Sequence, residues 1–353
     1  MNWFIKIYSV LFFWVASANL YAQSPTIQVL EQGRKTSIRG MSVVSDSTIW
    51  VSGSNGSVGK SRDGGTTWTW MTVKGYEKRD FRDIEAINDT TAIILGIAEP
   101  AILLKTKDGG NSWHLVFEDS TKGVFLDAMD FIKENESYSG IAIGDPLNQE
   151  AYILTTKNAG DSWTRLISND QPPFLKEEAF FASSGTNILF SKARKTSMVY
   201  FVTGGGASRL MCAPIPFNSS MISIPLLQGS SSTGANSIAL SATGDKAVIV
   251  GGDFFKDTLS SGNCVLVQLS SNKGSVQFTQ PQTNPHGYRS CVIYTSKNKL
   301  ITCGTSGVDI STDGGTNWQL ISRESFHVVQ KAKQGKAIFL AGSNGKIAKL
   351  SSF

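Results

Sequence analysis

Seven segments of the chain begin with a polar residue that is followed, two positions later, by an apolar one. The leading residues are Arg39, Arg82, Asp127, Glu178, Asn236, Arg289 and His327. Converging arginines suit recognition of a carboxylate or phosphate, because each guanidinium donates several hydrogen bonds in one plane. Two carboxyl groups such as Asp127 and Glu178 are the set that a glycoside hydrolase uses. The seven positions therefore predict a polar binding site or, as the alternative, a glycosidase-like centre.

Three more acidic residues, Glu99, Asp145 and Asp253, follow the next segments along the chain and are expected near the same point.

The sequence gives little support for other chemistries. The chain has three histidines, none close to a pair of cysteines, so we expect no metal site. There is no Gly-x-Ser-x-Gly motif, and no Gly-x-Gly-x-x-Gly follows a strand and opens a helix. We therefore expect no cofactor and favour a non-catalytic protein.

The elements that must carry these residues are short strands. After each polar-led segment comes a second apolar run, which usually ends in glycine. These runs are Trp50–Gly53, Ile93–Gly96, Ile141–Gly144, Tyr200–Gly204, Val248–Gly251, Ile301–Gly304 and Ile338–Gly342. Alternating or apolar runs bounded by turn residues are typical of strands, so the pattern predicts seven hairpins.

A turn motif occurs four times among these repeated segments. The copies are Ser61–Trp68, Thr106–Trp113, Thr156–Trp163 and Ser311–Trp318, each with the pattern Ser/Thr-x-Asp-Gly-Gly-x-x-Trp or a close variant. The third copy has Asn158 and Ala159 where the others have Asp and Gly. Successive copies begin 45, 50 and 155 residues apart, so the last interval corresponds to about three repeats.

The residue types of the motif indicate a hairpin turn. A short acidic side chain accepts backbone N–H groups about two residues further on, and glycine supplies the positive φ that other residues resist. The tryptophan begins the next strand and fills space against a neighbouring sheet. We assign a structural role to the turn residues Asp63, Trp68, Asp108, Trp113, Asn158, Trp163, Asp313 and Trp318.

The motif resembles the Asp-box, or BNR repeat, of sialidases, sortilin-type receptors and the photosystem II stability/assembly factor family. Over about residues 25–353 the chain is most similar to the last of these. Arg39-Gly40, Trp50–Gly56, Ser61–Trp68 and the echo at Ala341–Gly345 carry that likeness. The resemblance implies an all-β, seven-bladed propeller with four-stranded antiparallel blades and the Asp-box between third and fourth strands. It also implies a scaffold that binds a protein partner through a basic face.

The two ends of the sequence have separate roles in this fold. Residues 1–22 contain Lys6, an apolar run and a small residue at Ala22, which predicts a signal peptide and export to the periplasm or beyond. We expect residues 23–353 to form one propeller, with no later membrane span and a monomeric state. The last blade stops one strand short at Leu350, and Thr26–Leu30 has no blade of its own. We therefore expect the N-terminal strand to complete the last blade and close the ring.

In a propeller the inner strands start on the face opposite the Asp-box turns. The seven leading polar residues, with Glu99, Asp145 and Asp253, would meet there and bind a protein, a glycan or an anionic small ligand. Alternatively, they pair with one another across a wet channel. A sialidase-like hydrolase would need three arginines, a tyrosine and two acids, and Tyr288 is expected to point away from Arg289. The net charge of +5, without a basic run, gives no case for nucleic acid.

The four cysteines, Cys212, Cys264, Cys291 and Cys303, show no metal-binding spacing. Cys291 and Cys303 fall on adjacent predicted strands, one residue out of direct register. We expect buried free thiols there in preference to a disulfide.

Overall fold

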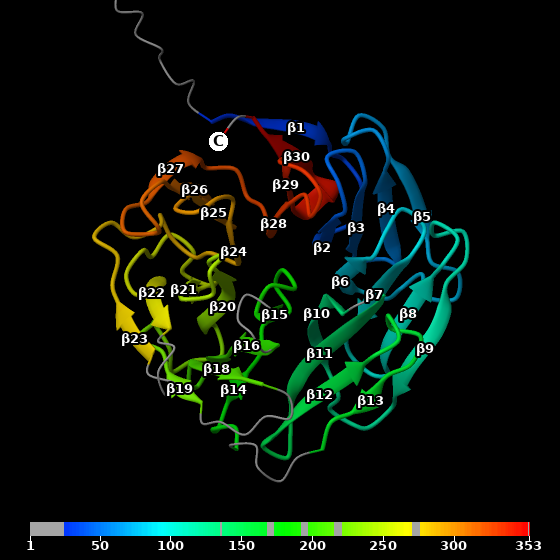
Figure 1. The fold of residues 1–353 in the computed structure, drawn as a ribbon, viewed down its shortest axis with the longest axis horizontal. Helices are drawn as coiled ribbons and strands as arrows, with labels where there is room; N and C mark the ends of the chain where they lie inside the picture. The colour runs from blue at the N-terminus through cyan, green and yellow to red at the C-terminus, as the bar shows by residue number, and fades with distance from the viewer. Residues whose placement is uncertain are drawn as a thin grey trace, which may run out of the picture.

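The computed structural model describes residues 25–353 except 135, 168–172, 192–196, 215–220, 270–275 and 352. The predicted signal peptide at residues 1–22 lies outside the described part. Strands form seven antiparallel sheets that stand around a central axis like the blades of a fan (Figure 1). The prediction of an all-β, seven-bladed propeller is thus confirmed. Among the described residues no helix has the length and apolar character needed to cross a bilayer.

The first three blades are regular, with their strands in sequence order from the axis outward. The inner strand of each begins at or next to a predicted polar-led segment. The first blade contains β2 (Ile38–Val43), β3 (Ile49–Gly53), β4 (Ser57–Ser61) and β5 (Thr69–Thr72); the second β6 (Phe81–Ala86), β7 (Ala92–Gly96), β8 (Ala101–Thr106) and β9 (His114–Asp119); the third β10 (Leu126–Glu134), β11 (Ser137–Leu147), β12 (Glu150–Thr156) and β13 (Thr164–Arg165).

The fourth and fifth blades depart from the repeat. The fourth contains β15 (Ile188–Ser191), β16 (Met198–Val202), β18 (Arg209–Ala213) and β19 (Ile222–Ser223). The fifth contains β20 (Thr233–Leu240), β21 (Lys246–Asp253), β22 (Cys264–Leu269) and β23 (Val276–Thr279), and its sheet is extended by β17 (Gly204–Gly205) and β14 (Glu178–Ala179). The prediction that Glu178 starts the fourth inner strand is therefore wrong, because its segment pairs with β17 instead.

The sixth and seventh blades return to the regular pattern. The sixth contains β24 (Cys291–Tyr294), β25 (Leu300–Gly304), β26 (Gly307–Ser311) and β27 (Gln319–Ser322); the seventh β28 (Val328–Lys331), β29 (Ile338–Ala341), the short 3₁₀ turn η1 (Ser343–Gly345), β30 (Ile347–Leu350) and β1 (Ile27–Glu31). β1 pairs antiparallel with β30, with Ile27 opposite Leu350, so it is the outermost strand of the last blade (Figure 1).

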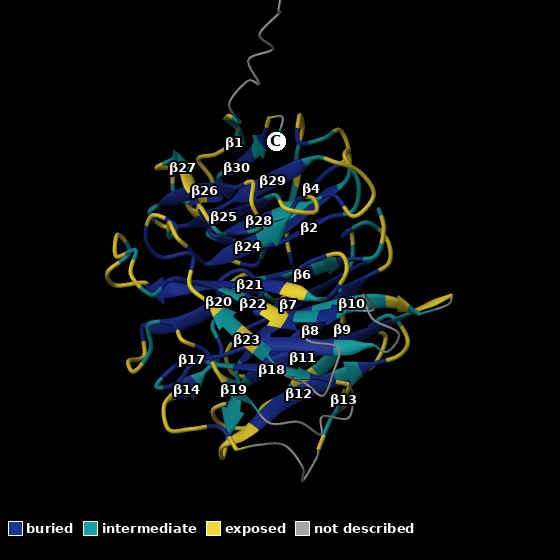
Figure 2. Cartoon of the chain, turned by 60° about the vertical axis from the view of Figure 1, so that its left-hand side comes forward, coloured by how far each residue is buried: buried dark blue, intermediate teal, exposed yellow. Residues whose placement is uncertain are grey.

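The hydrophobic core lies between the blades. Successive sheets bury their apolar faces against each other, so the strands in Figure 2 are mostly buried while the exposed residues lie mainly in the turns. Val248 and Val250 of β21, for example, share a cluster with Val292 and Trp318 of the sixth blade. Each blade therefore depends on its neighbours for burial, which is the property that makes a ring of repeats stable.

The four motif turns connect the third and fourth strands of their blades and are closed by one repeated pair of hydrogen bonds. In the first, Asp63 Oδ1 accepts from the Thr67 N–H and Ser61 Oγ accepts from the Gly65 N–H, both at 2.9 Å. The same pair recurs at 2.9–3.1 Å in the other three turns, with Asn158 in place of the acid in the third. The acid thus reaches four residues on, further than expected, across two consecutive residues with positive φ.

Each motif turn also docks on the preceding blade. The tryptophan after the turn joins the core shared with that blade, as Trp113 does when it packs edge-on against Trp50 at 6.5 Å between ring centroids. The second glycine fits closely against the same neighbour. A Cβ on Gly315 would lie 2.8 Å from Leu266 Cδ2 of the fifth blade, and one on Gly65 would lie 2.6 Å from Leu30 Cδ1. The turn residues therefore hold adjacent blades together.

Cys264, Cys291 and Cys303 are buried free thiols. The expected offset between Cys291 and Cys303 is wrong, because the two residues are direct partners in the β24–β25 ladder. The Cys291 thiol instead hydrogen-bonds to the Val329 carbonyl of the next blade at 3.3 Å.

Candidate binding site on the axis of the ring

Four of the side chains that face the axis lie at β-bulges at the start of an inner strand. Arg39 falls between the pairs Ile38–Gly53 and Gly40–Ser52, so it has no partner of its own in the ladder. The same irregularity occurs at Arg82, Asp127 and Asn236. A bulge re-aims one side chain away from the pleat, which explains how a residue at the edge of each blade turns to the axis.

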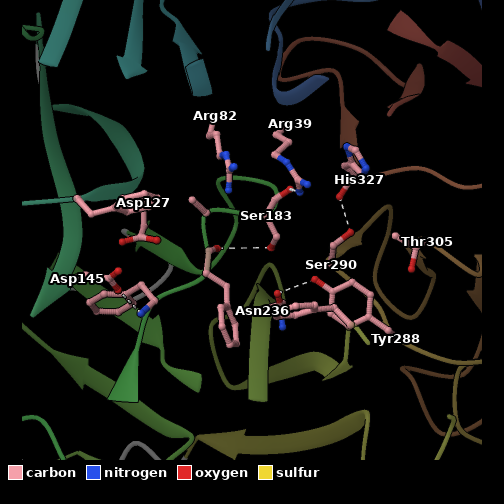
Figure 3. Close-up of a pocket in the computed structure, with 15 residues that line it drawn as sticks. Arg39, Arg82, Asp127, Asp145, Ser183, Asn236, Tyr288, Ser290, Thr305 and His327 are labelled. Carbon is pink, nitrogen blue, oxygen red and sulfur yellow. Dashed lines mark hydrogen bonds between the residues drawn. The ribbon is translucent and has the colours of Figure 1, made fainter. Parts of the chain in front are cut away.

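These residues line one cavity of about 420 Å³. Figure 3 shows their side chains converging from several blades. Six of the ten residues predicted from the sequence are present: Arg39, Arg82, Asp127, Asp145, Asn236 and His327. The remaining lining residues are Phe125, Phe180, Phe181, Ala182, Ser183, Phe254, Tyr288, Ser290 and Thr305.

The cavity opens on the face opposite the motif turns. In the first blade Ile38 pairs with Gly53 at one end of the sheet, whereas Ser61, which begins the motif, pairs with Ile49 at the other end. The same antiparallel order holds in every blade that carries the motif. The turn residues and the cavity residues therefore occupy opposite ends of the same strands.

Arg289 is not in the cavity, and this part of the prediction is wrong by one residue. The axial position of the sixth blade belongs to Ser290, and Arg289 points into the blade with no exposure. Its Nε donates to Asp309 Oδ2 at 2.8 Å, and its terminal nitrogens reach the Tyr288 carbonyl and Ser306 Oγ. The Tyr288 side chain points away from the Arg289 side chain, as expected, and it lines the cavity.

Glu178 is likewise a structural residue. Its carboxylate is fully buried, accepts from Arg209 Nε at 2.9 Å and from Thr203 Oγ1 at 2.6 Å, and does not line the cavity. Because Arg289 and Glu178 both lie elsewhere, the cluster of three arginines and two acids needed for a sialidase-like centre is not assembled. The alternative function is therefore not favoured.

Glu99 and Asp253 also stand outside the cavity. Glu99 is exposed and accepts a hydrogen bond from the Gly123 N–H. Asp253, at the end of β21, accepts a hydrogen bond from the Phe255 N–H at 3.0 Å. Both carboxylates thus organise the loops around the cavity.

Positive charge occupies one side of the cavity. Arg82 pairs with Asp80, Nε to Oδ2 at 2.9 Å, but Arg39 makes only a 3.3 Å hydrogen bond to the Ser183 carbonyl and has no ion pair within the described residues. Burial and the neighbouring Arg82 lower the pKa of Arg39. Burial, Arg39 and Arg82 together lower the pKa of His327 to about 4, so its ring is neutral at pH 7 and Nδ1 donates to the Ile38 carbonyl at 2.9 Å.

Negative groups occupy another side. Asp127 is fully buried, and neither carboxylate oxygen has a hydrogen-bond partner in the described structure. Burial, then the nearby Asp145, raises the pKa of Asp127 well above its usual value. Arg82 and the backbone N–H groups of Asp145 and Ala182 offset this in part, although neither N–H meets hydrogen-bond geometry. Burial raises the pKa of Asp145 to about 6, although the Phe180 N–H donates to it at 2.9 Å.

The aromatic wall of the cavity was not predicted from the sequence. Phe181, Phe254 and Tyr288 form a chain of edge contacts, with ring centroids 6.0–6.3 Å apart, and Phe255 continues it to the surface with 78% exposure. These rings come from irregular segments, where no strand period indicates direction. The one available signal was the enlarged loop after β21. In the part of the chain that the structure describes, no group of three potential metal ligands gathers.

The comparisons with known proteins agree with this architecture. Residues 22–122 match the family model described as photosynthesis system II assembly factor YCF48. No curated protein matches the sequence.

Solved propellers resemble almost the whole chain. The structure titled "YCF48 bound to D1 peptide" is 18% identical with a TM-score of 0.63, and the match covers 93% of this chain and 97% of that one. YCF48 from Cyanidioschyzon merolae is 16% identical with a TM-score of 0.58, over 92% and 98% of the two chains. The Pan2 WD40 domain of Neurospora crassa is 13% identical with a TM-score of 0.58, over 89% and 88%.

The two kinds of likeness support one conclusion. The family pattern is present in the first two blades, and the fold of the solved relatives extends around nearly the whole ring. The chain is a β-propeller whose first two blades are similar to the photosystem II assembly factor family.

Proposed function

We propose that this chain is an exported, non-catalytic propeller that binds a protein segment in its axial cavity. The observation that carries the proposal is Arg39. Its guanidinium lies in a cavity beside a second arginine and has no ion pair among the described residues, so an anionic group from outside can take that place. The similar YCF48 structure is one bound to a D1 peptide, which supports the use of this fold for a peptide ligand.

The size of the cavity indicates what kind of partner would enter. About 420 Å³ is at the small end of ligand sites and holds a few side chains, not a folded domain. A chain end or an extended loop would therefore insert. The exposed Phe254 and Phe255 at the side would contact the residues next to the inserted ones.

The binding proposal is tested by selecting heptapeptides from a random displayed library against the purified protein. The affinity of the best binder is then measured for Arg39→Gln and for Arg62→Gln, a matched change in an exposed motif turn on the opposite face. We expect Arg39→Gln to weaken binding about tenfold or more and Arg62→Gln to leave it unchanged. Equal affinities of the two variants would contradict the axial site.

Export is part of the same proposal and rests on residues 1–22 alone. We expect the mature protein to begin at Gln23. N-terminal sequencing of protein recovered from the periplasm or medium, beside a variant with Leu11→Arg and Phe12→Arg in the apolar run, checks this. Retention of Met1 in an exported protein would contradict it.

A further inference from the structure

Asp127 differs from every other residue at the axial position. Arg39, Asn236, Ser290 and His327 each make a hydrogen bond to a backbone carbonyl, and Arg82 pairs with Asp80. Asp127 makes none from its side chain within the described residues, although it has no exposure. Buried carboxylates in proteins are almost always paired, because desolvation without a partner is unfavourable. The Asp127 carboxyl, which lies in the cavity wall, is therefore a candidate ligand group.

Asp145 lies beside Asp127 and completes an acidic end to the cavity (Figure 3). The Phe180 N–H holds one oxygen of Asp145 at 2.9 Å, which fixes that carboxyl at the cavity wall. The Phe125 carbonyl accepts from the Asp145 N–H at 2.9 Å, which ties the backbone of Asp145 to the same end. Adjacent carboxyl groups are the environment that proteins use for ammonium and guanidinium groups.

The acidic end and the basic end belong to one cavity. In Figure 3 the guanidiniums of Arg39 and Arg82 lie on one side and the carboxyl groups of Asp127 and Asp145 on another. A ligand that carries only an anion would leave Asp127 buried and unpaired. A ligand that carries only a cation would leave Arg39 without an ion pair. Full pairing requires both charges.

Building on the proposed peptide binding, we propose that the axial cavity selects a segment that carries a carboxylate next to a basic side chain. The carboxylate binds Arg39 and Arg82, and the ammonium or guanidinium binds Asp127 and Asp145. A chain that ends in lysine or arginine presents both groups within one residue and is the simplest ligand of this class.

Four acetylated dipeptides separate the two charges. The probes are acetyl-Ala-Lys and acetyl-Ala-norleucine, each with a free carboxylate or a carboxamide at its end, and their affinities are measured by calorimetry up to millimolar concentration. We expect the lysine peptide with a free carboxylate to bind about tenfold more tightly than either singly charged peptide. The wild type is compared with Asp127→Asn, Asp145→Asn and Arg39→Gln, and with Asp89→Asn as an exposed control on the opposite face.

The ratio of lysine to norleucine affinity is the decisive quantity. Asp127→Asn and Asp145→Asn should each bring this ratio close to one while preserving the preference for a free carboxylate, and Asp89→Asn should change neither. Thermal unfolding of each variant shows that it is folded. An unchanged ratio in both acid variants would overturn the inference.

The inference and the proposed function fail separately. If none of the four dipeptides binds while the selected heptapeptide still depends on Arg39, the requirement for two charges is wrong and the axial peptide site stands. If Arg39→Gln has no effect on any ligand, the axial site itself is wrong.

Discussion

The two ends of the propeller blades use acidic residues in opposite ways. At the motif turns the Asp63 carboxylate is exposed and accepts from Thr67 and Ser61, and these hydrogen bonds lower its pKa to about 2. At the axial end Asp127 is buried without a partner and its pKa is raised. At the turn, the polar groups hydrogen-bond to one another and stabilise the fold. At the axial end, Asp127 has no hydrogen-bond partner in the described structure, so a ligand can supply one. Satisfaction of polar groups thus distinguishes a structural repeat position from a binding position.

The largest expected effect comes from Arg289, the fully buried arginine next to the axial position of the sixth blade. Arg289→Met removes the guanidinium from the buried Asp309 carboxylate, which then keeps only His286 as an ionisable partner, and should lower the free energy of unfolding by about 3–5 kcal/mol. Arg62→Met, at an exposed turn position, should stay within about 0.5 kcal/mol of the wild type. Denaturant unfolding measures both. Similar stabilities would mean that Arg289 is not the structural residue that its burial indicates.

The next effect distinguishes the two glycines of a motif turn. Gly315→Ala places a Cβ 2.8 Å from Leu266 with φ near +95°, and should cost about 2–4 kcal/mol. Gly314→Ala faces open space at φ +80° and should cost only about 1 kcal/mol. Chemical denaturation of the two variants gives the difference, and equal losses would show that docking on the preceding blade contributes little.

A smaller effect, of opposite sign at the two ends, is expected for Asp→Asn. Asp127→Asn should stabilise the protein by about 1–3 kcal/mol at pH 7.5, because it removes a buried carboxyl that ionises freely in the unfolded chain but not in the folded protein, while Asp63→Asn should destabilise it. The pKa of Asp127 is raised in the folded state, so its penalty is absent below about pH 4 and grows as the pH rises. The pKa of Asp63 is lowered to about 2, so its contribution is present above about pH 4 and is lost toward pH 2.

Unfolding of the two variants at pH 4 and pH 7.5 checks this pair. The gain from Asp127→Asn should be larger at pH 7.5. A loss of stability at pH 7.5 would indicate that Asp127 has a stabilising partner in the free protein.

The smallest effect is expected at the degenerate third turn. Ala159 adopts φ +57°, where the three other turns have glycine, so Ala159→Gly should stabilise the protein by about 0.5–1 kcal/mol. Thermal unfolding measures the change. A loss of stability would show that the Ala159 methyl makes contacts that outweigh its backbone strain.

The sequence predicts the regular blades well and the irregular one poorly. Strand alternation and the motif turns set the phase of the first three blades, and the leading residues of their inner strands, Arg39, Arg82 and Asp127, line the axial cavity. In the sixth blade the most polar residue, Arg289, is not the axial one. The signal that was available is Asp309, an acid inside an apolar strand that requires a buried cation.

The fourth blade could not be read in the same way. It lacks the motif, and the alternating segment around Phe180 resembles a strand but forms the wall of the cavity. The directions of Phe181 and Phe254 depend on loop conformations that tertiary contacts decide, so pattern alone does not give them.

The central claim is that a peptide segment binds at the axial end of the blades. A crystal structure of the protein with the selected heptapeptide tests it most directly. The account predicts a ligand carboxylate within hydrogen-bond distance of Arg39 and Arg82. A peptide seated on the motif-turn face or along an outer strand such as β5 would contradict it.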